Sequence, residues 1–136
     1  MTVALLDLDH FKRINDTHSH EAGDQVLCSV AELLQAAGAS AGTGSFVARM
    51  GGEEFLLVQV GADPATAAAR LDDLRRAVAG HPWVPLVGDL PVTISIGAST
   101  TRGRSATTPT DILSRADRHL YLAKRQGRDR VVGDPA

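Results

Sequence analysis

The chain has 136 residues, of which 43% are hydrophobic and 22% charged, and its formal net charge is −2. This length suits one domain, 1–136, that buries roughly two-thirds of its unfolded surface, and the charge balance excludes a disordered chain and a generic binder of polyanions. Aromatic residues make up only 4% of the sequence. Because stacking platforms for single-stranded nucleic acid need aromatic side chains, we expect no nucleic-acid partner.

A single cysteine, Cys28, cannot form an internal disulfide, which suits a reducing compartment. Its place in a predicted helix favours a small core residue. No apolar run approaches the ~20 residues that a membrane span needs, and no positively charged start marks a signal peptide. We therefore expect a cytoplasmic chain that makes no contact with a membrane.

Hydrophobic periodicity and the placement of glycine and proline predict the elements of the chain. In chain order they are a strand over 2–9, helices over 10–17 and 24–37, strands over 46–49 and 55–60, a helix over 63–79, a strand over 90–99, a helix from 108 to 127 and an edge strand over 130–132. Gly38 is expected to end the second helix, and Pro82 and Pro85 the third.

This order, β-α-α-β-β-α-β-α-β, predicts an α/β fold of the α+β sandwich kind. Helices that alternate with strands in this way pack on one sheet, and the split pattern predicts a mainly antiparallel sheet with a ferredoxin-like β-α-α-β-β-α-β core. Gly51-Gly52 between two strands is typical of a hairpin, because paired glycines accept positive φ. Glu53 and Glu54 are therefore expected at a turn.

The first strand ends in carboxylates. Period two places Val3, Leu5, Asp7 and Asp9 on one face. An unpaired charge on a largely buried strand is costly, and a cation at Asp7 would offset that cost. Asp9 has a plainer interpretation as the cap of a helix that starts at His10, which we favour over direct catalysis.

Carboxylates recur at three places that a fold could bring together. Besides the end of the first strand, these are Asp24 at the start of the long helix and Glu53 with Glu54 at the hairpin. Oxygen ligands favour Mg²⁺ or Mn²⁺, and no cluster of cysteine and histidine suggests zinc. Taken alone, Glu53 and Glu54 would be a solvated turn in most proteins.

Two stretches are candidates for phosphate binding. Gly42-Thr43-Gly44-Ser45 looks like a glycine-rich loop, but no Gly-Lys-Ser/Thr follows, so we interpret it as a flexible loop. Phe11-Lys12-Arg13 opens a helix, where backbone amides could face phosphates. The only two lysines, Lys12 and Lys124, fall in or near candidate segments, although chance placement on solvated helix faces explains that equally well.

Five separated motifs run along the chain in order. They are DLDHFKRIND at 7–16, His20 with Gly23-Asp24, RMGGEEF at 49–55, Ser95-Ile96-Gly97, and Ala116-Asp117 with Tyr121, Ala123-Lys124 and Gly127-Arg128. Together they closely resemble the GGDEF diguanylate cyclase family. The resemblance spans residues 3–132, and five motifs in the right order are far more specific than any one of them.

The resemblance implies the condensation of two GTP into cyclic di-GMP with release of two pyrophosphates. By that likeness Asp7, the backbone carbonyl of Leu8 and Glu53 hold Mg²⁺ (or Mn²⁺), with two ions for each GTP. Each chain would hold one guanine, whereas the product contains two guanylates related by two-fold symmetry. Two chains must therefore face each other as a homodimer. The likeness also predicts an upstream sensor domain in the full-length protein.

The same likeness makes Asn15 and Asp24 the readers of guanine and His20 a further substrate contact. A carboxylate can accept the N1–H and N2–H of guanine together, and adenine lacks that edge. The resemblance further implies that Phe11 contacts the substrate.

Catalytic roles are also implied by the family. Glu53 is the candidate base for the 3′-hydroxyl, Glu54 a supporting acid, Lys12 the stabiliser of developing phosphate charge, and Lys124 and Arg128 are phosphate contacts. In nucleotidyl transfer a protein mainly positions groups and neutralises charge, so a metal ligand that doubles as base is reasonable.

The sequence departs from the family in three places. The family usually has a helix before the first strand, whereas this chain begins at the strand, which predicts a domain trimmed at its N-terminus and a lower activity. Counting back from Gly51, Gly42 and Ser45 stand where the inhibitory product site has Arg and Asp, so we expect no product inhibition there. Ser19 replaces the glycine before His20, which costs about 1 kcal/mol if that residue needs positive φ.

Two functions remain open from the sequence. One is the enzyme, and the alternative is a GTP-binding regulatory module with little or no turnover. The intact stretch 51–55 favours the enzyme, and the missing leading helix favours the module. A cyclase that makes a different cyclic dinucleotide is disfavoured by Asp24.

Overall fold

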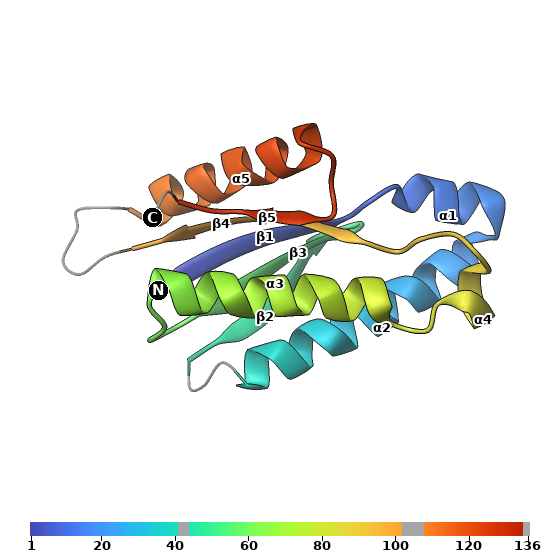
Figure 1. Ribbon diagram of the computed structural model, residues 1–136, viewed down its shortest axis with the longest axis horizontal. Helices are drawn as coiled ribbons and strands as arrows, with labels where there is room; N and C mark the ends of the chain where they lie inside the picture. The colour runs from blue at the N-terminus through green and yellow to red at the C-terminus, as the bar shows by residue number, and fades with distance from the viewer. Residues whose placement is uncertain (41–43, 102–107, 135–136) are drawn as a thin grey trace.

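The computed structural model describes residues 1–40, 44–101 and 108–134 (Figure 1). Its elements are, in chain order, β1 (Thr2–Leu8), α1 (Phe11–Thr17), α2 (His20–Ser40), β2 (Phe46–Gly51), β3 (Glu54–Gln59), α3 (Pro64–Gly80), α4 (Val84–Val87), β4 (Ile94–Thr100), α5 (Pro109–Arg125) and β5 (Arg130–Val132). This is the expected order, with the short α4 as an addition. Within the described residues, no helix is long and apolar enough to cross a bilayer.

The strands form a five-stranded sheet in the order β2-β3-β1-β4-β5. Neighbouring strands are antiparallel except for β4 and β5, which run parallel. The expected mainly antiparallel α/β fold is therefore confirmed. β1 lies at the centre, and near its end Asp7 stands opposite Glu54 of β3 on one side and Ser95 of β4 on the other.

Helices cover both faces of the sheet: Figure 1 shows α5 on one face and α2 with α3 on the other. One set of β1 side chains belongs to the core with α2 and α3, namely Ala4, Leu6 and Leu8. The alternate set faces α5, where Leu5 packs with Ala116 and Leu120. Asp7 continues this second set, as period two predicted, and meets α5 near the C-terminal end of that helix.

Side-chain caps fix the starts of two helices where the sequence predicted them. The carboxylate of Asp63 accepts a hydrogen bond from the backbone N–H of Thr66 at 2.7 Å, at the start of α3. Thr108 and Asp111 form a reciprocal capping box at the start of α5. These bonds satisfy backbone donors that the first turn of a helix leaves unpaired.

α2 extends beyond the predicted 24–37 at both ends. At its start the hydroxyl of Ser19 accepts a hydrogen bond from the backbone N–H of Ala22 at 3.0 Å, so a polar turn precedes the apolar stripe. Ser19 does not have a positive φ, so the strain that a positive φ would cause at this residue is absent. Gly38 does not end the helix: a Cβ there would lie 3.2 Å from Val47 Cγ2, and its small size lets α2 pack closely on β2.

Other boundaries also differ from the expected ones, and those at Pro85 and at the start of β4 differ for identifiable reasons. Pro85 begins a helical turn instead of ending a helix, because it lies in the first turn of α4, where the fixed φ of proline suits a helix. β4 starts at Ile94 instead of residue 90, because its pairing with β1 begins where Leu8, the last residue of β1, faces Ile94.

Candidate active site

Residues from three distant parts of the chain line a cavity of about 190 Å³ at the end of β1. Residues 7–12 come from the end of β1 and the start of α1, Glu53 from the hairpin, and Lys124 and Arg128 from the end of α5 and the turn after it. The cavity thus brings together most of the site residues that the sequence singled out: Asp7, Leu8, Phe11, Lys12, Glu53, Lys124 and Arg128.

Glu53 lies in the turn between β2 and β3, as the paired glycines predicted, and this turn lies beside the end of β1. The backbone N–H of Leu8 donates to the carbonyl of Glu53 at 3.2 Å, which ties the turn to the strand. Arg49 donates to the carbonyl of Gly52 through Nε at 3.0 Å and Nη2 at 2.7 Å. Gly52 has a φ of 44°, which glycine adopts without strain.

Asp7 is a half-buried acid of the cavity, with its side chain 13% exposed. Its Oδ2 accepts a hydrogen bond from Lys124 Nζ. Its Oδ1 is buried and has no hydrogen-bond partner among the described residues. A buried carboxylate oxygen in this state costs free energy unless a donor or a cation meets it.

The oxygen-bearing residues that line the cavity fit a hard divalent cation. Asp7 and Glu53 offer carboxylates and Leu8 a backbone carbonyl, and oxygen ligands are those that Mg²⁺ prefers. In the part of the chain that the structure describes, no three His, Cys, Asp or Glu side chains group into a metal site by themselves. Carbonyl and substrate oxygens would complete the coordination, as is usual for Mg²⁺.

Glu54 was expected at the turn with Glu53, but it is the first residue of β3, where it pairs with Asp7 of β1. It lies outside the lining of the cavity. Burial raises the pKa of its carboxyl above the ordinary value, and the negative charges of Asp7 and Asp117 raise it further, while Lys124 opposes them. Glu54 therefore keeps its proton to a higher pH than a solvated glutamate does.

Asp9 does not cap the helix that follows it, which corrects the expectation from the sequence. The N-cap of α1 is His10, with a φ of 54° and no side-chain cap. The carboxylate of Asp9 turns instead to the start of β4, where it accepts hydrogen bonds from Thr93 Oγ1 at 2.7 Å and Ser95 Oγ at 2.6 Å. Those two hydroxyls are the physical reason that the carboxylate is not available to α1.

Asn15, an expected guanine reader, packs on Gly23 where α1 meets α2. A Cβ at Gly23 would lie 1.9 Å from Asn15 Oδ1 and 3.2 Å from Phe11 Cζ. Within the described residues this oxygen of Asn15 is buried without a hydrogen-bond partner. Phe11 lines the 190 Å³ cavity and also lies next to Gly23 and Asn15, so the cavity and the surroundings of Asn15 share this residue.

Asp24 and His20, at the start of α2, are both exposed and do not line the first cavity. Asp24 instead borders a second cavity of about 320 Å³, together with Cys28, Arg49 and Phe55. The carboxylates at the end of β1 and at the hairpin therefore meet, whereas Asp24 lies apart from them. Cys28 is exposed on α2, so the expected core position is wrong: it follows the buried Leu27 but lies off the buried stripe.

Comparison with known proteins decides the family. The family model "Diguanylate cyclase, GGDEF domain" matches residues 1–130. The chain belongs to the GGDEF family. It is 40% identical over 131 residues to diguanylate cyclase DgcP of Pseudomonas aeruginosa, covering 96% of this chain and 19% of that protein. This chain thus spans about a fifth of that relative.

Solved GGDEF structures share the fold. The active GGEEF domain of a diguanylate cyclase from Vibrio cholerae matches with a TM-score of 0.86 and 32% identity, covering 99% of this chain and 83% of that one. The GGDEF domain of DgcB from Caulobacter crescentus, in complex with c-di-GMP, matches with a TM-score of 0.86 and 32% identity, covering 97% of this chain and 76% of that one.

From the sequence, Gly42 and Ser45 are expected at the positions of the family's inhibitory product site. Gly42 lies outside the described residues. The hydroxyl of Ser45 accepts a hydrogen bond from the backbone N–H of Val60 at 3.2 Å, which joins the start of the hairpin to its end. The expected lack of product inhibition through this site stays a prediction.

The sequence did not reveal the polar contacts that extend from Asp9 of the cavity to α3. Asp129 donates its backbone N–H to Asp9 at 3.0 Å, and its carboxylate accepts a hydrogen bond from Arg75 at 3.0 Å. Neither Asp129 nor Arg75 belongs to a chemical motif with a recognisable spacing. Their contacts depend on how α3 and the turn after α5 pack, which no local pattern encodes.

Proposed function

We propose that this chain is a diguanylate cyclase that condenses two GTP into cyclic di-GMP and releases two pyrophosphates. The observation that carries the proposal is the cavity at the end of β1, where oxygen donors from Asp7 and Glu53 lie with the cations of Lys12, Lys124 and Arg128. Membership of the GGDEF family and the names of its relatives support the same reaction. The lone cysteine suits a cytoplasmic setting.

In the proposed site Asp7, the carbonyl of Leu8 and Glu53 would hold Mg²⁺ or Mn²⁺, two ions for each GTP. When bound, the ions neutralise the triphosphate and polarise the oxygens that react. The buried Oδ1 of Asp7, which has no partner among the described residues, supports this role. Lys12, Lys124 and Arg128 would balance the remaining phosphate charge.

The chemical step is a nucleotidyl transfer. The 3′-oxygen of one GTP attacks the α-phosphorus of the other, and the bond from that phosphorus to the oxygen of the β-phosphate breaks, so that pyrophosphate leaves. Glu53 takes the proton of the 3′-hydroxyl. Glu54 is the proposed supporting acid, as the resemblance to the GGDEF family implies. A second, symmetrical transfer closes the ring.

The two GTP molecules that react are bound by two different chains. Each chain is proposed to bind one guanine through Asn15 and Asp24, with His20 and Phe11 as further contacts. Because the product is two-fold symmetric, two sites must face each other in a homodimer, at least during turnover. The rate is then expected to rise with the square of chain concentration at low concentration, which a dilution series measures.

Replacement of Asp24 by serine is expected to weaken the preference for GTP over ATP by about tenfold, the effect of one lost charge-assisted hydrogen bond. Serine keeps a polar group but cannot accept the N1–H and N2–H of guanine together. Titration with both nucleotides measures the preference. Asp73→Ser serves as the control, because Asp73 is exposed on α3. An unchanged preference for GTP in Asp24→Ser would refute the role of Asp24 as a reader of guanine.

Replacement of Gly23 by alanine is expected to displace the amide of Asn15, because the new Cβ would lie 1.9 Å from Asn15 Oδ1. The dissociation constant for GTP should rise about tenfold, as for the loss of a hydrogen bond to guanine. If the effect passes through Asn15, Gly23→Ala adds little in an Asn15→Ala chain. Equal effects in both backgrounds would assign Gly23 a role in helix packing alone.

The experiment that tests the proposal is incubation of the purified chain with GTP and Mg²⁺, followed by chromatography and mass spectrometry. Cyclic di-GMP and pyrophosphate in a ratio of one to two are expected, and removal of the ion with EDTA should stop their formation. GTP binding without product would support the regulatory module instead. Absence of both binding and product would refute the proposed site.

A further inference from the structure

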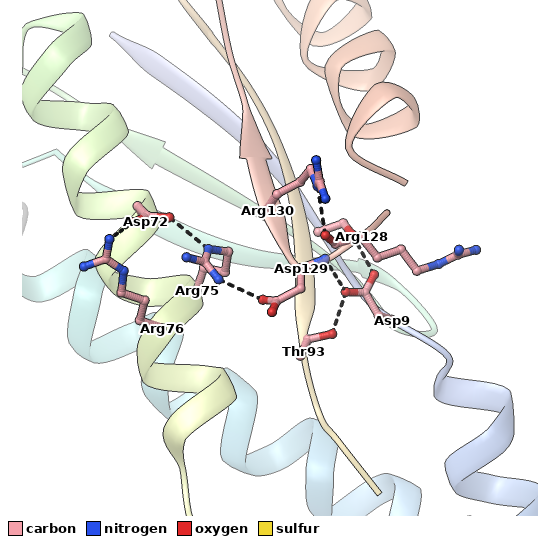
Figure 2. Close-up of polar contacts among 9 residues, drawn as sticks. Asp9, Asp72, Arg75, Arg76, Thr93, Arg128, Asp129 and Arg130 are labelled. Carbon is pink, nitrogen blue, oxygen red and sulfur yellow. Dashed lines mark hydrogen bonds and ion pairs between the residues drawn. The ribbon is translucent and has the colours of Figure 1, made fainter. Parts of the chain in front are cut away.

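Asp9, which lines the cavity, is the centre of a polar cluster that has no part in the proposed chemistry. At its centre the carboxylate of Asp9, 4% exposed, accepts hydrogen bonds from Thr93 Oγ1 at 2.7 Å, Ser95 Oγ at 2.6 Å and the backbone N–H of Asp129 at 3.0 Å. Figure 2 shows Asp9 between Thr93 and the turn that carries Asp129. A carboxylate has about four acceptor positions. Three donors therefore leave Asp9 little capacity to bind a metal ion as well.

The turn that Asp9 contacts has an unfavourable backbone. Arg128 and Asp129 have φ values of 65° and 45°, in the left-handed region that residues with a Cβ rarely adopt. Such a backbone persists only where the surrounding contacts hold it. The bond from Asp129 N–H to Asp9 is one such contact, and the bond from Arg128 N–H to the carbonyl of Ala123 at 2.9 Å is another.

Arg75 of α3 holds the same turn from a second side. Its Nη1 donates to the carboxylate of Asp129 at 3.0 Å, and its Nε donates to Asp72 at 2.9 Å. Among the residues drawn in Figure 2, the neighbouring Arg76 pairs only with Asp72, at 2.8 Å. The two arginines thus share one carboxylate and differ in whether they contact the turn.

In Figure 2 the side chains of Arg128 and Asp129 leave the turn in opposite directions, Asp129 toward Arg75 and Arg128 away from it. Arg128 lines the 190 Å³ cavity. We propose that Asp9 and Arg75 are positioning residues, which fix this turn so that Arg128 meets a phosphate of bound GTP. The inference rests on the proposed function, because that function supplies the phosphate. Asp9 and Arg75 act on Arg128 through Asp129.

The first test compares Arg75→Ala with Arg76→Ala, each in the unaltered chain and in an Arg128→Ala chain. Calorimetric titration with GTP and Mg²⁺ measures the dissociation constant. Arg75→Ala is expected to raise it about fivefold when Arg128 is present and less than about twofold when Arg128 is absent, because residues that act through one another are not additive. Arg76→Ala should leave it unchanged in both.

Two results overturn the role of Arg75. One is an equal effect of Arg75→Ala in both backgrounds, and the other is an effect of Arg76→Ala as large as that of Arg75→Ala. Either result would reduce Arg75 to a stabiliser of α3. If Arg75→Ala does not fold, Arg75→Lys replaces it, because lysine keeps the charge but lacks the fork that contacts Asp72 and Asp129 together. The same dependence on Arg128, with a smaller effect, is then expected.

The second test measures hydrogen exchange at the backbone N–H of Asp129 by NMR. Asp9→Ala is expected to speed exchange by about tenfold or more, because it removes the acceptor of that N–H. In Asp9→Asn the exchange rate should stay near that of the unaltered chain, because the amide oxygen of asparagine can still accept the hydrogen bond from Asp129 N–H. Unchanged exchange in Asp9→Ala would overturn the role of Asp9. This readout needs no nucleotide, so failure of the unaltered chain to bind GTP would refute the proposed function separately.

Discussion

Replacement of Glu53 by glutamine is expected to lower the formation of cyclic di-GMP by about a thousandfold, the order expected when a general base that also holds a metal is lost. Glutamine has nearly the same shape, and the carbonyl of residue 53 can still accept the hydrogen bond from Leu8 N–H that fixes the turn. The change therefore removes a negative charge and a proton acceptor while it leaves the hairpin in place. Product is quantified by chromatography at saturating GTP.

The matched control for this prediction is Glu32→Gln. Glu32 is exposed on α2 and lies outside the lining of both described cavities, so its replacement removes the same charge without touching the site. Unfolding by urea should give the same midpoint for both variants. Product formation by Glu53→Gln at a rate near that of the control would contradict both proposed roles of Glu53.

The part of the site that the sequence predicted is the part encoded by local patterns. Period two along β1 placed Asp7 on the same face as Leu5, and the paired glycines placed Glu53 at a hairpin; both expectations are confirmed, since Leu5 and Asp7 both meet α5. The meeting of these two segments follows from the antiparallel pairing of β1 with β3, where Asp7 faces Glu54. A motif order shared with the GGDEF family supplied the remaining assignments.

Prediction from the sequence was wrong where a side chain has both a local and a distant partner available. Asp9 precedes a helix and has the chemistry of a cap, but Thr93 and Ser95, 84 and 86 residues away, bind its carboxylate instead. That choice depends on the register of β1 against β4, which a single sequence does not specify. Gly38 is a similar case, because its neighbour Val47 belongs to another element and makes glycine a packing residue inside α2.

Replacement of Gly97 by alanine is expected to destabilise the fold by more than about 4 kcal/mol, which places it among the most damaging single substitutions. Gly97 lies in β4 beneath α5, and a Cβ there would lie 2.0 Å from Leu120 N and 2.2 Å from the carbonyl oxygen of Ala116. Both atoms belong to the backbone, so no side-chain rotation relieves the overlap. Urea unfolding followed by circular dichroism measures the loss.

Relief of that overlap would require α5 to move away from the sheet as a unit. Such a movement would expose Ala116 and Leu120, which pack with Leu5, and would also shift Lys124 from Asp7. Gly80→Ala is the control, because a Cβ there meets nothing within 4 Å and φ is not positive, and we expect a change within about 0.5 kcal/mol. If Gly97→Ala unfolds at the same urea concentration as Gly80→Ala, α5 does not pack as closely on β4 as described, and the placement of Lys124 in the cavity loses its support.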